Sequence, residues 1–305
     1  MEFGRVEENE LYKIDFKLPN DPATNQQFLS GKPDAECKVY GGCAKWGRAE
    51  WVGKIYPEKT REKDFLKYYV EHFNSIELNA THYRIFGPIA VQRWAAKAEG
   101  KDFLFCPKMH QGVTHRGRLN ERTFLLNEFL RGVVAFENHL GPILIQFNET
   151  FSPKRRNELF DFLAALPTHL QFVAELRHPR WFADDKTKDE LFSKLTELRI
   201  GSVITDTAGR RDCAHMRLTT PKAFVRFVGN DLHETDFPRI DNWVNRIKLW
   251  LDNGINQVYF FIHMHDEAKS PDLTAYLIDR LNDVCELKLH KPQFIGSTAP
   301  LVNRK

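Results

Sequence analysis

The chain has 305 residues and a mass of 35.7 kDa, with 42% hydrophobic and 28% charged residues. These values are typical of a folded globular protein and exclude a disordered or fibrous one. Lys and Arg exceed Asp and Glu by only 44 − 41 = 3 residues, so bulk charge does not indicate nucleic-acid binding.

The chain carries no targeting or membrane signal that we can identify. Its longest apolar runs, such as 258–262, are far shorter than the roughly 20 residues of a membrane helix. The first ten residues are rich in Glu and lack the apolar core of a secretory signal. The five cysteines are scattered and form no C-x-x-C pair. We therefore expect a cytoplasmic protein without disulfides or a membrane partner.

Strand-like and helical segments alternate along most of the chain. A polar N-terminal extension (1–37) and a polar C-terminal tail (288–305) flank a central domain (38–287). Within that domain, eight apolar runs read as strands: 38–43, 75–83, 103–110, 141–148, 172–178, 201–207, 223–229 and 257–265. Apolar residues at helical spacing separate the runs, and only the link 208–222 lacks a convincing helix.

This order predicts a single (β/α)8 TIM barrel with a weak or missing sixth helix. An open doubly wound sheet is the alternative, but no G-x-G-x-x-G follows the first strand.

Polar side chains recur where the predicted strands end. Six of them are charged: Glu77, Lys108, Glu175, Arg177, Asp206 and Arg226. Barrel enzymes place their chemistry at the carboxyl ends of several strands, so we expect these side chains to meet in one mouth.

Residue chemistry suggests roles for these groups. We expect Glu77, Lys108, Glu175 and Asp206 to be catalytic, because a lysine of lowered pKa beside carboxylates can serve as an acid, a base or a Schiff-base amine. Arginine pairs suit phosphate or carboxylate, and the predicted substrate-binding residues are Arg177, Arg226, Asn79, Gln146, Tyr83, His115, Trp181 and His263.

Other interpretations of the same residues stay open. Three acids against three bases could form a structural layer of ion pairs. His263 and His265 share a strand face and could chelate a metal, but three nearby bases would repel it, so we expect no metal and no cofactor. The leading prediction is an enzyme of the isomerase, lyase or hydrolase type, acting on a small oxygen-rich anion such as a sugar or sugar phosphate. The alternative is a non-catalytic barrel that binds nucleic acid or protein. Of the possible ligands, we expect a small anionic molecule rather than nucleic acid.

The sequence also resembles the domain-of-unknown-function-72 family over roughly residues 39–286. The matching pieces, in chain order, are Gly41, Trp51, Tyr56-Pro57, Tyr69, Phe73, Glu77-Leu78-Asn79, Thr81, Tyr83, Trp94, Lys108, Thr114-His115, Gly141-Pro142, Gln146, Ala174-Glu175, Arg177-His178, Trp181, Asp206 and Val225-Arg226. The resemblance implies a bacterial or archaeal protein with a TIM-barrel fold, a distant similarity to sugar-isomerase barrels and no settled activity.

Overall fold

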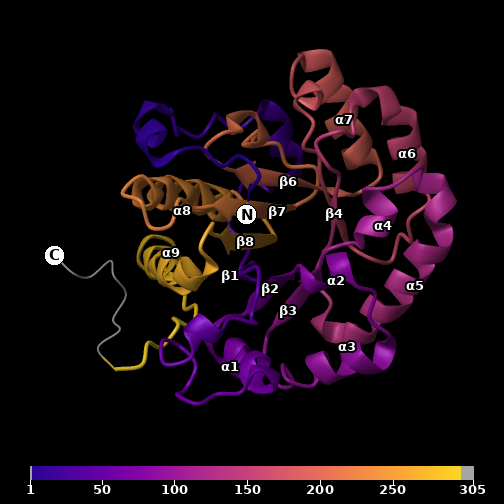
Figure 1. The fold of residues 1–305 in the computed structure, drawn as a ribbon. Coiled ribbons are helices and arrows are strands. Elements are labelled where there is room, and N and C mark those ends of the chain that lie inside the picture. The colour runs from indigo at the N-terminus through magenta and orange to yellow at the C-terminus, as the bar shows by residue number, and fades with distance from the viewer. Residues whose placement is uncertain (1, 297–305) are drawn as a thin grey trace.

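Parallel strands line the interior of the molecule, and helices cover their outer side (Figure 1). The computed structural model describes residues 2–296. The strands are β1 (Lys38–Cys43), β2 (Ser75–Leu78), β3 (Leu104–Pro107), β4 (Ile143–Gln146), β5 (Phe172–Glu175), β6 (Gly201–Asp206), β7 (Lys222–Val228) and β8 (Gln257–His263). The helices are α1 (Phe65–His72), α2 (Ala80–Tyr83), α3 (Pro88–Ala95), α4 (Gln111–Thr114), α5 (Thr123–Val133), α6 (Arg156–Ala164), α7 (Asp185–Glu197), α8 (Asp236–Asp252) and α9 (Ser270–Cys285).

The strands do not close into the predicted eight-stranded TIM barrel, and that prediction is wrong. Six of them form one parallel sheet in the order β1-β8-β7-β6-β5-β4, and β2 and β3 form a separate two-stranded sheet. The architecture is an α/β half-barrel with a small additional sheet. A sequence pattern shows that strands are present, but it does not show which neighbouring strands complete their hydrogen-bonded ladder.

Side chains replace the ladder between β1 and β2. The hydroxyl of Tyr69 on α1 accepts a hydrogen bond from the Cys43 amide at 2.8 Å and donates to the Ser75 carbonyl at 3.0 Å. Asn74 accepts from the Gly41 amide at 2.8 Å and donates to the Val39 carbonyl at 2.9 Å. The edge groups of β1 are therefore satisfied without strand pairing.

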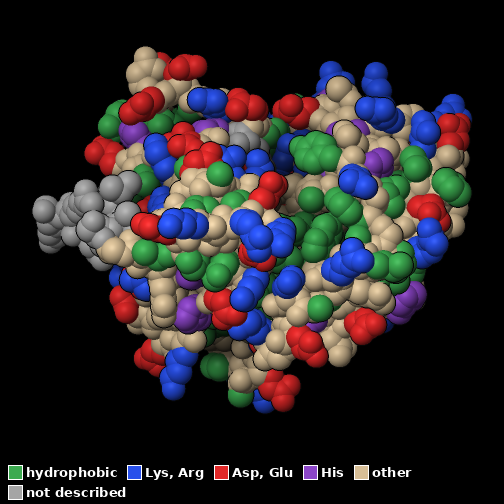
Figure 2. All heavy atoms as spheres, turned by 60° about the horizontal axis from the view of Figure 1, so that its bottom comes forward, with side chains coloured by type: hydrophobic (Ala, Val, Ile, Leu, Met, Phe, Trp, Pro, Cys, Tyr) green, Lys and Arg blue, Asp and Glu red, His purple; other side chains and the backbone are tan. Residues whose placement is uncertain are grey.

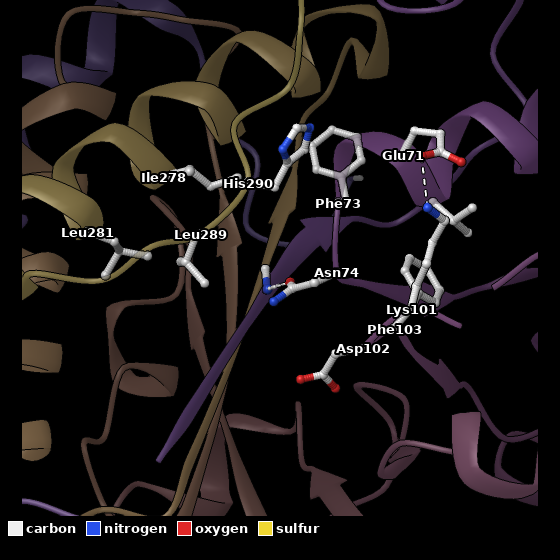
Figure 3. A pocket seen from close by; sticks show the side chains of 12 residues that line it. Glu71, Phe73, Asn74, Lys101, Asp102, Phe103, Ile278, Leu281, Leu289 and His290 are labelled. Carbon is white, nitrogen blue, oxygen red and sulfur yellow. Dashed lines mark hydrogen bonds and ion pairs between the residues drawn. The ribbon is translucent and has the colours of Figure 1, made fainter. Parts of the chain in front are cut away.

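Gly42 allows these two strands to approach. A Cβ at this position would collide with the Ser75 carbonyl oxygen and the Tyr69 hydroxyl. Near the amino ends of the strands, a pocket of about 270 Å³ lies beside the break, with Asn74 and Asp102 among its lining residues (Figure 3).

Between β3 and β4 the pairing is reduced to isolated bridges. Phe105 pairs with Leu140, and Lys108 pairs with Leu144. The Met109 amide donates to the Leu144 carbonyl at 2.8 Å, so the strands touch without forming a regular ladder.

The interior contains an apolar layer. Its buried members come from alternate positions of the strands and are Tyr40, Cys106, Leu144, Val173, Val203, Phe224, Tyr259 and Phe261. Because strand side chains alternate between faces, the next inward positions toward the carboxyl ends are Glu77, Lys108, Gln146, Glu175, Thr205, Arg226 and His263. We call this polar level of the interior the mouth.

The N-terminal segment covers the region between β6 and β7, where the connection contains only the 3-10 turn Arg211–Cys213 in place of an α-helix. Asn25 donates to the Met216 carbonyl and accepts from the Leu218 amide, both at 2.8 Å. Leu18 is buried in the same apolar cluster as Met216 and Leu218. The segment therefore supplies contacts that a sixth helix would provide.

At the other end, the predicted tail is described only to residue 296, and 297–305 lie outside the described residues. Leu289 exchanges hydrogen bonds with Asn282 on α9. The Ile295 amide donates to the Lys54 carbonyl at 2.9 Å, so this part of the tail is held against the domain. Within residues 2–296, no helix has the length and hydropathy needed to cross a membrane.

Candidate functional site

Arg226 on β7 lies at the centre of the mouth and binds two carboxylates. Its Nε donates to Glu77 Oε2 at 2.7 Å, and its Nη2 donates to Glu77 Oε1 at 2.9 Å. Its Nη1 lies 2.8 Å from each oxygen of Glu175. All three side chains are almost completely buried. Arg226 was predicted to hold a substrate anion, but here its hydrogen bonds go to protein carboxylates.

Glu77 has two further partners in the mouth. His263 Nε2 lies 3.0 Å from Glu77 Oε2, and Asn79 Nδ2 donates to Oε1 at 3.0 Å. Burial opposes the charge of Glu77, but the attraction of Arg226 and His263 outweighs it and holds the pKa well below its usual range. Burial also lowers the pKa of His263. Glu77 is therefore an ionised structural acceptor with its oxygens already occupied.

Glu175 is similarly engaged. Thr205 Oγ1 donates to its Oε1 at 2.7 Å, and Arg177 Nε lies 3.3 Å from the same oxygen. Burial would raise the pKa of Glu175, yet Arg177 and Arg226 together lower it to about 2. Sequence reasoning missed Thr205, because it selected the more strongly polar neighbour on that strand.

Asp206 is that neighbour, and its predicted place in the mouth is wrong. Its carboxylate points to the opposite face of β6, where it accepts from Trp243 Nε1 at 2.7 Å and Arg239 Nη2 at 3.0 Å. Arg211 forms a further ion pair with it. Because Thr205 faces the interior, the strand alternation turns Asp206 toward helix α8.

Lys108 differs from the other charged groups of the mouth. Its side chain is buried, with 6% of the residue exposed, and its amine forms no hydrogen bond or ion pair with the described part of the chain. Burial, followed by repulsion from Arg226, lowers the pKa of Lys108 to about 7. At neutral pH the amine is therefore present in both protonated and neutral forms.

Two other groups of the mouth have unused hydrogen-bonding capacity. Arg177 Nη2 and Gln146 Oε1 are buried and have no hydrogen-bond partner among residues 2–296. The Gln146 amide nitrogen lies 3.4 Å from Nε2 of His115. Burial and then the charge of Lys108 lower the pKa of His115 to about 4, so this imidazole is neutral at pH 7. Unpaired buried polar groups are uncommon in folded proteins and mark places where a ligand can bind.

The two predicted aromatic ligand-binding residues are placed differently. Trp181 is buried, and its Nε1 donates to the Phe151 carbonyl at 2.7 Å, so it braces the loops after β4 and β5. Tyr83 is 68% exposed at the rim. It lines a pocket of about 270 Å³, together with Trp46 and Asn79, at the carboxyl ends of β1 and β2.

Sequence reasoning also missed a residue far outside the predicted domain. The ring of Phe3, in the N-terminal segment, lies with its centroid 4.1 Å from the guanidinium carbon of Arg177. Nothing in the polar pattern of residues 1–37 indicated a contact with the mouth.

The described residues contain no group of three His, Cys, Asp or Glu side chains arranged to hold a metal ion. Across the mouth itself, the carboxylates of Glu77 and Glu175 are each paired with arginine. The arrangement as a whole is a buried ion-pair cluster next to an amine of lowered pKa, an arginine with an unused nitrogen and an amide oxygen without a partner in the described chain.

These features define a parallel α/β protein with a polar mouth at the carboxyl ends of its strands. The chain belongs to the family described as "Protein of unknown function DUF72", whose model matches residues 40–294. The resemblance seen in the sequence is thereby confirmed.

Relatives and solved structures agree with this assignment. The chain is 28% identical to the UPF0759 protein YecE of Escherichia coli (strain K12) over 261 residues, covering 80% of this chain and 92% of YecE. It is 28% identical to the UPF0759 protein YunF of Bacillus subtilis (strain 168) over 156 residues, covering 48% of this chain and 52% of YunF.

Two crystal structures of DUF72 family proteins share the fold. The protein from Enterococcus faecalis V583 gives a TM-score of 0.65 at 15% identity, covering 85% of this chain and 98% of that one. The protein from Thermotoga maritima MSB8 gives 0.63 at 21% identity, covering 81% and 99%.

Proposed function

We propose that this protein is an enzyme that binds a small, oxygen-rich anion in the mouth and uses the amine of Lys108 as its acid–base group. The observation that carries the proposal is the buried Lys108 amine, with a pKa of about 7, in the electrostatic field of an arginine whose Nη2 has no partner among the described residues. Strongly shifted pKa values beside unpaired polar groups are typical of functional sites.

The charge balance of the mouth favours an anion. Glu77 and Glu175 are ionised and are matched by Arg226 and Arg177, while His263 and His115 have lowered pKa values. Protonated Lys108 adds one uncompensated positive charge. A phosphate or carboxylate that reaches Arg177 Nη2 would supply the missing negative charge and two or more acceptors.

Gln146 adds a requirement for the rest of the ligand. Its Oε1 is a buried acceptor without a donor in the described chain. A hydroxyl next to the anionic group would supply that donor, which favours hydroxy acids, sugar acids and sugar phosphates. A lysine with a pKa near 7 suits proton transfer at a carbon beside a carbonyl in such molecules.

The surface gives less support to the alternative of a nucleic-acid-binding barrel. On the side of the molecule seen in Figure 2, acidic side chains lie among the basic ones. Arg155 and Arg156, two adjacent bases at the amino end of α6, are paired with Glu158 and Glu190.

Anion binding can be tested by thermal unfolding with phosphate at constant ionic strength. Wild-type protein should show a rise in Tm with phosphate, because a ligand of the folded state stabilises it by mass action. Arg177→Gln should abolish the rise, and the matched control Arg180→Gln, an exposed arginine on the same loop, should preserve it. Equal responses of the wild type and Arg177→Gln would contradict the anion site.

The acid–base role requires a separate measurement. Sugar phosphates and hydroxy acids that raise Tm should be incubated with the protein in D2O and followed by proton NMR. We expect loss of a C–H signal next to the carbonyl of at least one compound. Lys108→Met should stop the exchange, while Arg177 should still support a reduced Tm response. Exchange that continues in Lys108→Met would contradict the assigned role.

A further inference from the structure

The N-terminal segment reaches the mouth through residues 2–6. This part of the chain lies outside residues 40–294, which the family model matches. Its Phe3 side chain is buried, with 7% of the residue exposed, although the flanking Glu2 is exposed. The burial of this one aromatic ring beside exposed residues indicates that the ring packs at a specific position on the domain.

The Phe3 ring packs against two arginines at the rim of the mouth. The guanidinium carbons of Arg177 and Arg210 lie 4.1 and 5.3 Å from the ring centroid. Arg210 Nη1 also donates to the Arg177 carbonyl at 2.6 Å. A phenylalanine ring carries no oxygen or nitrogen acceptor, and Arg177 Nη2 keeps no hydrogen-bond partner in the described chain despite this contact.

Arg177 is consequently held and shielded, and part of its hydrogen-bonding capacity stays unused. Its side chain is only 12% exposed, it has one carboxylate at 3.3 Å, and its Nη2 has no hydrogen-bond partner in the described chain. An arginine held in this way binds an anion at a smaller entropic cost than a mobile surface arginine does.

Main-chain hydrogen bonds anchor this part of the segment to the loop after β6. The Gly209 amide donates to the Gly4 carbonyl at 2.8 Å. Thr207 Oγ1 lies 3.2 Å from the carbonyl oxygens of both Phe3 and Gly4. Gly4 has φ +69°, and a Cβ there would collide with the Thr207 side chain, so this docking requires glycine.

We propose that Phe3 is a positioning residue of the anion site, which closes the mouth over Arg177 and holds its guanidinium edge toward a bound phosphate or carboxylate. The inference rests on the proposed function. It assigns to the N-terminal segment a part of the ligand site that the matched region does not contain.

The test measures phosphate affinity by calorimetry and phosphate release by competition kinetics in full-length protein. Phe3→Leu keeps an apolar side chain but removes the aromatic face, and it should weaken phosphate binding between about 5-fold and about 30-fold, mainly through faster release. Phe3→Tyr keeps the ring and should restore affinity to within about 2-fold of the wild type.

Gly4→Ala tests the docking independently of the ring. It should weaken phosphate binding to a similar extent because the added methyl group displaces the segment from Thr207. Gly31→Ala is its matched control, since Gly31 has a similar φ of +79° and nothing within 4 Å of an added Cβ. Phosphate affinity should be unchanged in Gly31→Ala.

The outcomes separate this inference from the proposed function. If wild type binds phosphate, Arg177→Gln does not, and Phe3→Leu binds as tightly as wild type, the role of Phe3 is wrong while the anion site stands. Equal weakening in Phe3→Leu and Phe3→Tyr also overturns it, because the aromatic face then has no part. If wild type itself does not bind phosphate, the proposed anion site fails first.

Discussion

Arg226 Nη1 lies 2.8 Å from each carboxylate oxygen of Glu175, and both side chains are buried in the interior lined by the strands. The other nitrogens of the same guanidinium bind Glu77. One arginine thereby joins strands that belong to the two separate sheets. A buried ion pair of this kind is costly to break, because removing one partner leaves the other charge buried with neither a counter-charge nor water around it.

Glu175→Gln should therefore destabilise the protein by roughly 3 kcal/mol, within the range found for broken buried ion pairs. The variant leaves Arg177 without its carboxylate and Arg226 with only Glu77. Urea unfolding at pH 7 measures the loss. A free energy of unfolding equal to that of wild type would show that the cluster does not stabilise the fold.

The same carboxylate should make the protein acid-sensitive. The pKa of Glu175 is about 2 in the folded protein, and a free glutamate titrates near about 4.3. Its stabilising contribution is thus present above about pH 4 and is lost as the pH falls through about 2. The loss of stability over that range should be smaller in Glu175→Gln than in wild type, as measured by unfolding at each pH.

Lys108→Met should have the opposite effect on stability. The folded-state pKa of about 7 lies below the ordinary value of about 10.4. The unfolded chain therefore binds more protons between pH 7 and pH 10, and the wild-type protein gains stability as the pH rises through that window. Below pH 7 the full cost of burying the charged amine remains.

We accordingly expect Lys108→Met to raise the free energy of unfolding by a few kcal/mol at pH 6, on the scale of about 1.4 kcal/mol per pKa unit. The gain should shrink toward pH 10. A gain that is the same at pH 6 and pH 10 would indicate better packing rather than relief of a buried charge.

Asp206→Asn should destabilise the fold and leave phosphate binding intact. The aspartate accepts hydrogen bonds from Trp243 and Arg239 on the helix-facing side of β6. Loss of this buried charge should cost roughly 2 to 4 kcal/mol, measured by urea unfolding. Loss of the phosphate response in this variant would instead connect Asp206 to the mouth.

Tyr69→Phe tests the side-chain bridge between β1 and β2. The change leaves the buried Cys43 amide without its acceptor and should cost roughly 1 to 3 kcal/mol. Tyr68→Phe, at the adjacent and less buried position of α1, is the matched control and should be nearly neutral. Equal losses in both variants would show that the hydroxyl bridge is not the cause.

The pattern of apolar and polar residues predicts which segments are strands and where polar groups fall along them. Each of the eight apolar runs overlaps a strand, because buried parallel strands need nearly continuous apolar residues. Side chains at alternate positions of these strands face the interior. The polar ones among them are Glu77, Lys108, Gln146, Glu175, Arg226 and His263. The link without a helical pattern between β6 and β7 likewise has only a 3-10 turn.

The way in which these strands and side chains meet depends on long-range contacts that no local pattern encodes. The contact between β1 and β2 depends on Tyr69 and Asn74, whose side chains replace a strand ladder between the two separate sheets. The inward residue of β6 was Thr205 rather than Asp206, because register with the neighbouring strands sets which alternate positions face the interior. Phe3 contacts Arg177 although the two residues are 177 − 3 = 174 positions apart in the sequence. Such a contact depends on the path of the folded chain, so no pattern in residues 1–37 indicates it.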